Sequence, residues 1–403
     1  MKRLAVSLSI ILIALVAASA AHAQAKPLTI NDLLKIRRVE DPQLSPDGRW
    51  VAYTISDLNM DANRRVAQIY LVSMDGGEAR QLTNAPQPSS SPRWSPDGKR
   101  IAFISAREGG PQVWTIDVVT NEQKRVTNIS TGASDPVWSP DGRMIAFVSD
   151  VYPDCTTDDC NQKRAEQAES SKVTAKIADR LLYRHWKTWK EGKRTHVFVA
   201  SVDGGLARDM TPGDYDAPPF SLGGPSDYAF SPDSKELVFA RNTDKVEATS
   251  TNGDLFIVPI NGTEAQRITS KNPGADLSPV YSPDGRYIAY RSQSRAGFES
   301  DRWQLMLFDR KSGQSRSLTD KLDTNVESIT FAPDGQRIYL TGTERGKQFI
   351  YAVPAAGGAI AKLVTDGFND DVKVSNDGKT IIFSRSTSVM PTEIFRANAD
   401  GSN

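Results

Sequence analysis

The sequence contains few of the residue types from which enzyme active sites are most often built. Only three histidines and two cysteines occur among its 403 residues, although histidine is the most frequent general base in proteins. It also lacks a G-x-S-x-G nucleophile elbow and the H-E-x-x-H, P-loop and G-x-G-x-x-G motifs. We therefore expect this chain to carry no catalytic residue, no metal site and no cofactor.

An excess of one charge is also missing, because Lys and Arg together number 49 and Asp and Glu together number 49. Because the chain has no net positive charge to attract polyanions, we expect no binding to nucleic acid and no general attraction to anionic membranes. Beyond the first residues, no stretch approaches the roughly 20 apolar residues that a membrane-spanning helix needs. We therefore expect no membrane span in the mature chain.

The first residues are the exception to this lack of apolar runs. Lys2 and Arg3 precede an apolar run from Leu4 to Val16, and Ala21-His22-Ala23 forms an A-x-A cleavage site. This order is typical of a secretory signal peptide. We assign residues 1–23 to such a peptide and expect a periplasmic or secreted protein; an uncleaved membrane anchor is the alternative.

The two cysteines, Cys155 and Cys160, lie close together in the sequence D-C-T-T-D-D-C. In an oxidising compartment such a pair is expected to form a local disulfide. A metal site is the alternative, but zinc sites usually need two further Cys or His ligands nearby.

A repeated turn is what the chain has in abundance. The tetrad Ser-Pro-Asp-Gly, or a close variant of it, begins at Ser45, Ser95, Ser139, Ser231, Ser282, Ala332 and Ser375. Proline at the second position, Asp at the third and Gly at the fourth suit a tight turn. An alternating run of β-branched and aromatic residues follows each tetrad, as in R-I-A-F-I or Y-I-A-Y-R. Each tetrad is therefore predicted to close a β-hairpin.

The rest of the unit repeats as well, with a further strand, a D-G-G turn in several units and an ending of one apolar residue followed by Thr. Four short strands in about 45 residues are typical of a propeller blade. The pattern predicts an all-β protein, residues 24–403, folded as a seven-bladed β-propeller of four-stranded blades. Eight blades are the alternative, because the interval from Ser139 to Ser231 is about twice the usual one.

We interpret the long interval as one blade, the third, with an insertion at about residues 151–195. Within it, the polar segment from Asn161 to Leu182 has no Gly or Pro and is predicted to be partly helical. The seventh unit stops at residues 399–403 without the apolar-Thr ending found in the other six. We therefore expect an incomplete last blade and a truncated chain.

Several segments together resemble a known family. The repeated tetrads resemble the TolB-like propeller repeat. The sequences V-Y-P-D-C, Y-R-H-W-K-T-W-K-E-G-K-R-T-H-V-F-V and A-G-F-E-S-D-R-W resemble the N-terminal propeller of the prolyl oligopeptidase family, in its acylaminoacyl-peptidase and dipeptidyl-peptidase branch. The similarity covers the whole mature chain. Lys187 stands between the two tryptophans, where the family commonly has Asp.

This resemblance implies a function. In that family an α/β-hydrolase domain with a Ser, Asp and His triad follows the propeller, which admits peptides and excludes folded proteins. That domain is absent here, so we expect the substrate-gating, non-catalytic part of a secreted serine exopeptidase whose partners are peptide substrates. A free-standing TolB-like propeller that binds proteins in the cell envelope is the alternative.

The resemblance also implies substrate-binding residues. Because relatives place acidic propeller residues near the substrate amine, Glu299 is a candidate for binding the α-ammonium group. Trp186 and Trp189 are candidates for the apolar wall of the same cavity, and Arg184 for contact with a peptide carbonyl. The structural alternatives are that Glu299 pairs with Arg302 and that the tryptophans pack the insertion onto its blade.

Overall fold

The computed structural model describes residues 27–402, apart from 180, 221–225 and 263. The signal peptide assigned to residues 1–23 lies outside the described residues. The chain separates into two compact units, one ending at Ile36 and one starting at Arg37. In the first, helix α2 (Ile30–Lys35) begins with a capping box, in which the Asp32 amide donates to Thr29 Oγ1 and the Thr29 amide donates to Asp32 Oδ2. Among the described residues, no helix is long and apolar enough to cross a membrane.

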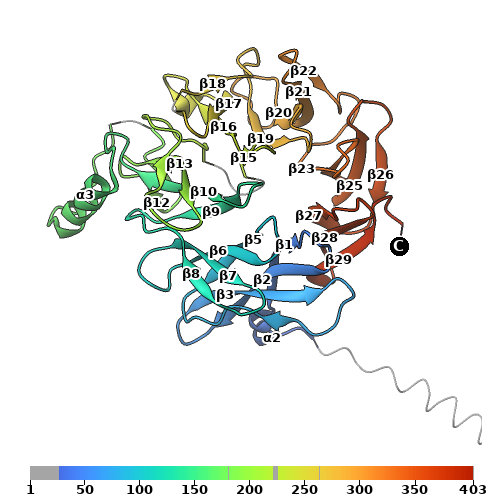
Figure 1. Ribbon diagram of the computed structural model, residues 1–403, viewed down its shortest axis with the longest axis horizontal. Coiled ribbons are helices and arrows are strands. Elements are labelled where there is room, and N and C mark those ends of the chain that lie inside the picture. The colour runs from blue at the N-terminus through green and yellow to red at the C-terminus, as the bar shows by residue number, and fades with distance from the viewer. Residues whose placement is uncertain (1–26, 180, 221–225, 263, 403) are drawn as a thin grey trace, which may run out of the picture. The chain divides into compact units, whose positions relative to one another are not determined.

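Antiparallel sheets of four strands make up most of the second unit, and Figure 1 shows them following one another around a common centre. This confirms the all-β class. The first three sheets contain β1 (Arg38–Leu44), β2 (Trp50–Asn59), β3 (Arg64–Ser73) and β4 (Arg80–Gln81); β5 (Ser89–Trp94), β6 (Arg100–Ser105), β7 (Gln112–Asp117) and β8 (Gln123–Arg125); and β9 (Ser134–Trp138), β10 (Met144–Val151), β13 (Arg194–Ser201) and β14 (Arg208–Asp209).

The next two sheets have the same antiparallel order. They contain β15 (Tyr228–Phe230), β16 (Glu236–Asn242), β17 (Gly253–Pro259) and β18 (Gln266–Arg267), and then β19 (Asp276–Tyr281), β20 (Tyr287–Ser292), β21 (Gln304–Asp309) and β22 (Gln314–Ser317). A short 3-10 helix, η1 (Glu247–Thr249), lies in the β16–β17 connection.

The last sheet joins seven strands. It contains β23 (Ser328–Phe331), β24 (Arg337–Glu344), β25 (Lys347–Pro354), β26 (Ala361–Val364), β27 (Phe368–Val374), β28 (Thr380–Thr387) and β29 (Met390–Asn398). All of its pairings are antiparallel except one parallel bridge between Gln348 of β25 and Phe368 of β27. The sheet therefore consists of two antiparallel groups, β23–β26 and β27–β29, which meet at a single residue pair.

Each tetrad connects the first two strands of its four-stranded sheet, or of its antiparallel group in the seven-stranded sheet, through a small hydrogen-bond network. In the fifth sheet, Ser282 Oγ donates to Asp284 Oδ1 at 2.5 Å, and the Arg286 amide donates to the same oxygen at 3.0 Å. Gly285 has a φ of 69°, a left-handed backbone conformation that glycine adopts more readily than residues with a side chain. The same Ser–Asp hydrogen bond occurs in the tetrads that begin at Ser45, Ser95, Ser139, Ser231 and Ser375. The repeated tetrad is thus a hydrogen-bonded turn, as the sequence predicts.

We expect Asp284→Ala to lower the free energy of unfolding by about 1 kcal/mol at pH 7, because the turn loses two hydrogen bonds to a charged group at an exposed site. The Ser282 hydroxyl and the Arg286 amide hold the pKa of Asp284 below its ordinary value. A depressed pKa stabilises the fold above the unfolded pKa of about 3.9, and this contribution is lost as the pH falls. Urea unfolding of both proteins should therefore differ at pH 7 and converge below about pH 4; a constant difference would contradict the assignment.

Neighbouring tetrads touch one another. A Cβ atom on Gly98 would lie 3.6 Å from Cδ of Pro46. The same contact relates Gly142 to Pro96, Gly285 to Pro232 and Gly335 to Pro283. The last tetrad has Asn376 where six others have Pro, and its Nδ2 donates to the Pro46 carbonyl oxygen at 2.7 Å. This amide thus connects the last repeat to the first.

The Thr that ends most repeats also has a structural role. Thr127 Oγ1 donates to Gln112 Oε1 at 2.7 Å and accepts from the Val113 amide at 2.9 Å. Equivalent amide-to-Thr hydrogen bonds are made by Thr83, Thr211, Thr269 and Thr319. The fourth strand is short, and this buried hydroxyl attaches its end to the third.

The insertion leaves the third sheet between β10 and β13, which pair without interruption from Met144 opposite Ser201 to Val151 opposite Arg194. It contains helix α3 (Asp158–Ser170) and a two-stranded hairpin of β11 (Arg184–His185) and β12 (Thr188–Trp189). The insertion is partly helical, as predicted, but both bounds of the helix differ from those of the segment Asn161–Leu182 that favours one. The helix begins earlier, because Thr157 caps it by accepting from the Cys160 amide. It stops at Ser170, because another serine and the β-branched Val173 and Thr174 follow, which favour helices less.

Candidate functional site

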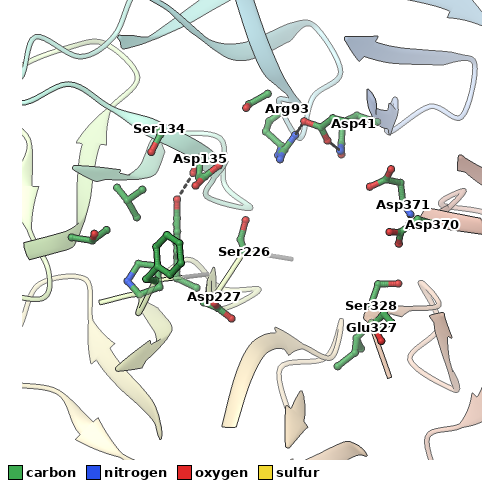
Figure 2. A pocket seen from close by; sticks show the side chains of 18 of the residues that line it. Asp41, Arg93, Ser134, Asp135, Ser226, Asp227, Glu327, Ser328, Asp370 and Asp371 are labelled. Atoms are coloured by element: carbon green, nitrogen blue, oxygen red, sulfur yellow. Dashed lines mark hydrogen bonds and ion pairs between the residues drawn. The ribbon is translucent and has the colours of Figure 1, made fainter. Parts of the chain in front are cut away.

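A cavity of about 1160 Å³ lies where the first strands of the sheets face one another. Figure 2 shows labelled side chains from several sheets arranged around this space. Its lining includes the carboxylates of Asp41, Asp135, Asp227, Glu327, Asp370 and Asp371. Among the described residues, the basic side chains of the lining are those of Arg93, Arg291 and Lys373. Acidic groups therefore predominate in the cavity, although the whole chain carries no net charge.

The cavity lining comes from one position of the repeat. The residue four places before each tetrad is Asp or Ser in all seven units, namely Asp41, Ser91, Asp135, Asp227, Ser278, Ser328 and Asp371. All but Ser278 line the cavity. This position was not predicted from the sequence, although its restriction to Asp or Ser is visible once the tetrads are aligned.

A left-handed backbone places several of these residues. Asp41, Ser91, Asp135, Ser278 and Asp371 have φ values between 49° and 56°. All five first strands with such a residue, β1, β5, β9, β19 and β27, also show a shift of register there, as β-bulges do. Asp is among the non-glycine residues that tolerate the left-handed region best. The bulge therefore favours a short polar side chain.

Ion pairs neutralise part of the acidic lining. Arg93 Nη1 lies 2.7 Å from Asp41 Oδ2, and Arg291 Nη2 lies 3.4 Å from Glu327 Oε2. Asp227 has no ion pair among the described residues; its Oδ1 accepts from the Ser278 amide at 2.7 Å and from the Ser278 hydroxyl at 3.2 Å.

Burial acts on three other acids of the lining. It raises the pKa of Asp135, against the effect of the nearby Arg93, and it also raises the pKa of Asp227, against the hydrogen bonds from Ser278. Burial and the adjacent Asp371 together raise the pKa of Asp370. The cavity thus holds carboxylates whose charge is costly and which gain from a cationic or hydrogen-bond-donating ligand.

The insertion hairpin stands beside this cavity. The ring of His185 stacks on Phe220 with centroids 3.7 Å apart, and Phe220 lines the cavity. Arg184 lies over the ring of Trp189, 5.5 Å from its centroid, and the ring of Tyr183 stacks on the same Trp189 ring with centroids 5.7 Å apart. Trp186, at the hairpin turn, is 78% exposed. The structure therefore brings Arg184 and Trp189 together, but neither they nor Trp186 are part of the cavity lining.

A buried ionic network fixes the base of the insertion. The side chain of Arg194 is 8% exposed and contacts Asp214 at 2.8 Å, Glu247 at 2.6 Å and Asp216 at 3.2 Å. Lys190 pairs with Asp216 at 2.6 Å. Burial alone would raise the pKa of Asp216, but Lys190 and Arg194 hold it below its ordinary value. The network connects the hairpin to the segment before Phe220 and to the β16–β17 connection. In the same insertion, Cys155 and Cys160 form a disulfide with their Cα atoms 5.4 Å apart.

Glu299 lies elsewhere, in the exposed β20–β21 connection. Its carbonyl oxygen accepts from Gln293 Nε2 at 3.0 Å, and Gly297 in the same loop donates its amide to Thr251 Oγ1 at 3.0 Å. Arg302 donates to the carbonyl oxygens of Leu322 and Asp320, and no ion pair between Arg302 and Glu299 occurs in the described part of the chain. Glu299 does not line the cavity.

Comparisons with known proteins agree with this architecture. The model of the TolB beta propeller domain matches residues 36–180. The chain is 31% identical to dipeptidyl-peptidase 5 of Porphyromonas gingivalis over 389 residues, which cover 92% of this chain and 54% of that protein. It is 27% identical to dipeptidyl-peptidase 5 of Trichophyton schoenleinii, covering 85% of this chain and 50% of the relative. The chain thus spans about half the length of the relatives it matches.

Solved structures support the fold. An acylaminoacyl peptidase in complex with Z-Gly-Gly-Phe-chloromethyl ketone superposes with a TM-score of 0.69 at 16% identity, over 91% of this chain and 53% of that one. The β-propeller domain of the Trilobed protease from Pyrococcus furiosus superposes with a TM-score of 0.61 at 17% identity, over 90% and 93%. At these identities the similarity concerns the propeller fold.

Proposed function

This chain is a TolB-like β-propeller that fits the propeller of a prolyl oligopeptidase-family peptidase, and from this premise we propose that it is the substrate-gating part of a secreted serine exopeptidase. The observation that carries the proposal is the match to dipeptidyl-peptidase 5 over 92% of this chain but only 54% of the relative. The remaining part of such a protein would supply an α/β-hydrolase domain with the catalytic triad. The propeller would then select which peptides reach it.

The proposal includes seven blades, with β23–β26 and β27–β29 counted separately. Among the described residues, one parallel bridge is the only backbone ladder pairing between these groups, and each group begins with a strand that follows the repeat pattern. Six of the seven first strands then contribute residues to the lining of the central cavity.

Gating would depend on the cavity and its surroundings. A space of about 1160 Å³ accommodates an unfolded peptide segment but no folded domain. The hairpin residues Arg184, Trp186 and Trp189 would contact peptides beside Phe220, and Glu299 would bind the free α-ammonium group by a charge-assisted hydrogen bond. Secretion is supported by the signal-peptide pattern of residues 1–23 and by the Cys155–Cys160 disulfide.

The test compares this chain alone with a longer protein that also contains the hydrolase domain. We expect the chain alone not to hydrolyse dipeptidyl or acylaminoacyl chromogenic substrates, and the longer protein to hydrolyse at least one of them. In that protein, Glu299→Gln should lower kcat/KM about tenfold for free-amine substrates, since a hydrogen bond to a charged group contributes about 1.5–3 kcal/mol. The same variant should leave N-acylated substrates nearly unchanged.

Glu122→Gln is the matched control, because Glu122 is an exposed acid in a turn of the second sheet. Equal losses on both substrate types for Glu299→Gln would assign Glu299 a structural role. Hydrolysis by the chain alone, with contaminating peptidases excluded, would refute the non-catalytic assignment.

A further inference from the structure

Arg241, at the end of β16, has an environment unlike that of the other arginines near the cavity. Its guanidinium carbon lies 4.2 Å from the ring centroid of Phe256, 5.3 Å from that of Tyr215 and 5.7 Å from that of Phe239. Phe239 and Phe256 stack on each other and are buried, whereas Tyr215 is 37% exposed. The guanidinium therefore sits on an aromatic surface that opens to solvent at Tyr215.

None of its N–H groups has an acceptor among the described residues, and Nε is completely buried. Arg291 and Arg93, by contrast, each pair with a carboxylate. Burial accordingly lowers the pKa of Arg241, with Tyr215 opposing the shift. Stacking on rings stabilises a cation, but it leaves the N–H groups in the guanidinium plane unsatisfied.

The repeat supplies an internal comparison. Arg385 occupies the same position as Arg241, ten residues after the start of its tetrad, and lies over a cross-strand pair of aromatic rings, Phe383 and Phe395. Its Nε, however, donates to Asn369 Oδ1 at 2.8 Å. The same arginine position thus has a polar partner within the protein in one sheet and none in the other.

A second unsatisfied group lies at the same end of this hairpin. Asn242 pairs with Gly253, and Asn252, the residue before Gly253, has a buried Oδ1 that accepts no hydrogen bond from the described residues. Its Nδ2 is used, because it donates to Asp244 Oδ1 at 3.1 Å. One end of the β16–β17 hairpin therefore presents free cationic donors and a free acceptor.

We propose that Arg241 and Asn252 form a binding site for the C-terminal residue of a peptide. A carboxylate accepts two parallel hydrogen bonds from the guanidinium fork, and the last peptide N–H satisfies the Asn252 oxygen. The unpaired buried groups destabilise the free protein, so forming these hydrogen bonds would make the free energy of binding more favourable. The site lies beside the cavity wall, since the Ala240 amide donates to the carbonyl oxygen of Asp227 at 2.9 Å. It does not depend on the proposed catalytic partner.

The test uses the chain as it is, with trialanine and trialaninamide as probes and calorimetry as the measurement. We expect trialanine to bind at least about tenfold more tightly than its amide, and Arg241→Met to abolish this difference. Arg241→Lys, which keeps the charge and removes the fork, should bind trialanine more weakly than the wild type. Equal binding of acid and amide, or unchanged discrimination in Arg241→Met, would overturn the proposal.

Arg385→Met is the matched control. It removes the equivalent arginine together with an internal hydrogen bond, so it should lower Tm while keeping the preference for trialanine. Arg241→Met removes stacking contacts but no hydrogen bond within the described residues, so it should lower Tm less than Arg385→Met does in the absence of peptide. If Arg385→Met lost the preference instead, carboxylate binding would belong to another site.

Discussion

Gly274→Ala is expected to lower the free energy of unfolding by at least about 3 kcal/mol, or to prevent folding. A Cβ atom at this position would lie 2.1 Å from the carbonyl oxygen of Gln293. That oxygen also accepts from Asn272 Nδ2 at 2.8 Å, and the Gln293 amide donates to the Ala275 carbonyl at 2.8 Å. The two backbone segments cannot separate without breaking these bonds. Urea unfolding followed by tryptophan fluorescence measures the change.

Gly110→Ala is the control for this substitution. A Cβ atom on Gly110 meets nothing within 4 Å, and the backbone there is not left-handed. Alanine should therefore be neutral, or stabilise by about 0.4–1 kcal/mol because the unfolded chain loses freedom. If Gly274→Ala were as stable as Gly110→Ala, the carbonyl oxygen of Gln293 would not lie close to residue 274 in solution.

The second large effect concerns Asp276, a carboxyl group with no exposed surface. Asn272 Nδ2 donates to its Oδ1 at 2.8 Å, but Oδ2 is buried and has no hydrogen-bond donor in the described part of the chain. Asp254 is equally buried; Arg267 pairs with it, and Thr269 Oγ1 donates to it at 3.1 Å. Burial raises the pKa of Asp276 to about 7, with the charge of Asp254 adding to the shift.

The direction of the resulting pH dependence follows from linkage. Between the unfolded pKa of about 3.9 and the folded value near 7, the folded protein binds a proton that the unfolded chain has lost. Stability should therefore fall as the pH rises through this range, by about 2–4 kcal/mol in all. Asp276→Asn removes the ionisation, so the variant should be more stable than the wild type at pH 8 and similar to it at pH 5.

Urea unfolding at pH 5, 6, 7 and 8 tests this expectation. Tyr290 also faces Asp276, but it does not ionise in this range because burial raises its pKa further. Asp284→Ala, in the same sheet, should differ from the wild type by the same amount from pH 5 to 8, since the stabilising effect of Asp284 is lost only below about pH 4. Parallel curves for wild type and Asp276→Asn from pH 5 to 8 would contradict the assignment.

Local chemistry explains why much of the fold was predictable. A tetrad such as Ser282 to Gly285 specifies its own turn through hydrogen bonds within a few residues, and those bonds do not depend on the rest of the chain. The apolar-Thr ending similarly marks where a short fourth strand attaches. The bounds of helix α3 were not predictable, because composition describes a segment and does not locate a cap such as Thr157 or a stop such as Ser170.

The site was less predictable, because its residues are brought together by the ring of sheets. Asp41 and Asp371 are separated by 330 residues in sequence and line one cavity. Sequence motifs consist of residues that are close together in the chain. They therefore pointed to Glu299 and to the W-K-T-W segment, neither of which lines that cavity. The position four residues before each tetrad becomes visible when the repeats are compared with one another. The sequence does not show that Arg241 lacks a hydrogen-bond acceptor in the described part of the chain, because Arg385 occupies the same position of the repeat and has one.

The junction between the insertion and its sheet has a consequence for how such propellers diversify. The β10–β13 ladder is continuous up to Val151 and Arg194, so the 42 residues between them add nothing to the backbone pairing. A short turn at this point would leave the same ladder intact. The segment can therefore be lengthened, shortened or exchanged during evolution while the sheet beneath it stays unchanged, and new surfaces beside the cavity arise without refolding the scaffold.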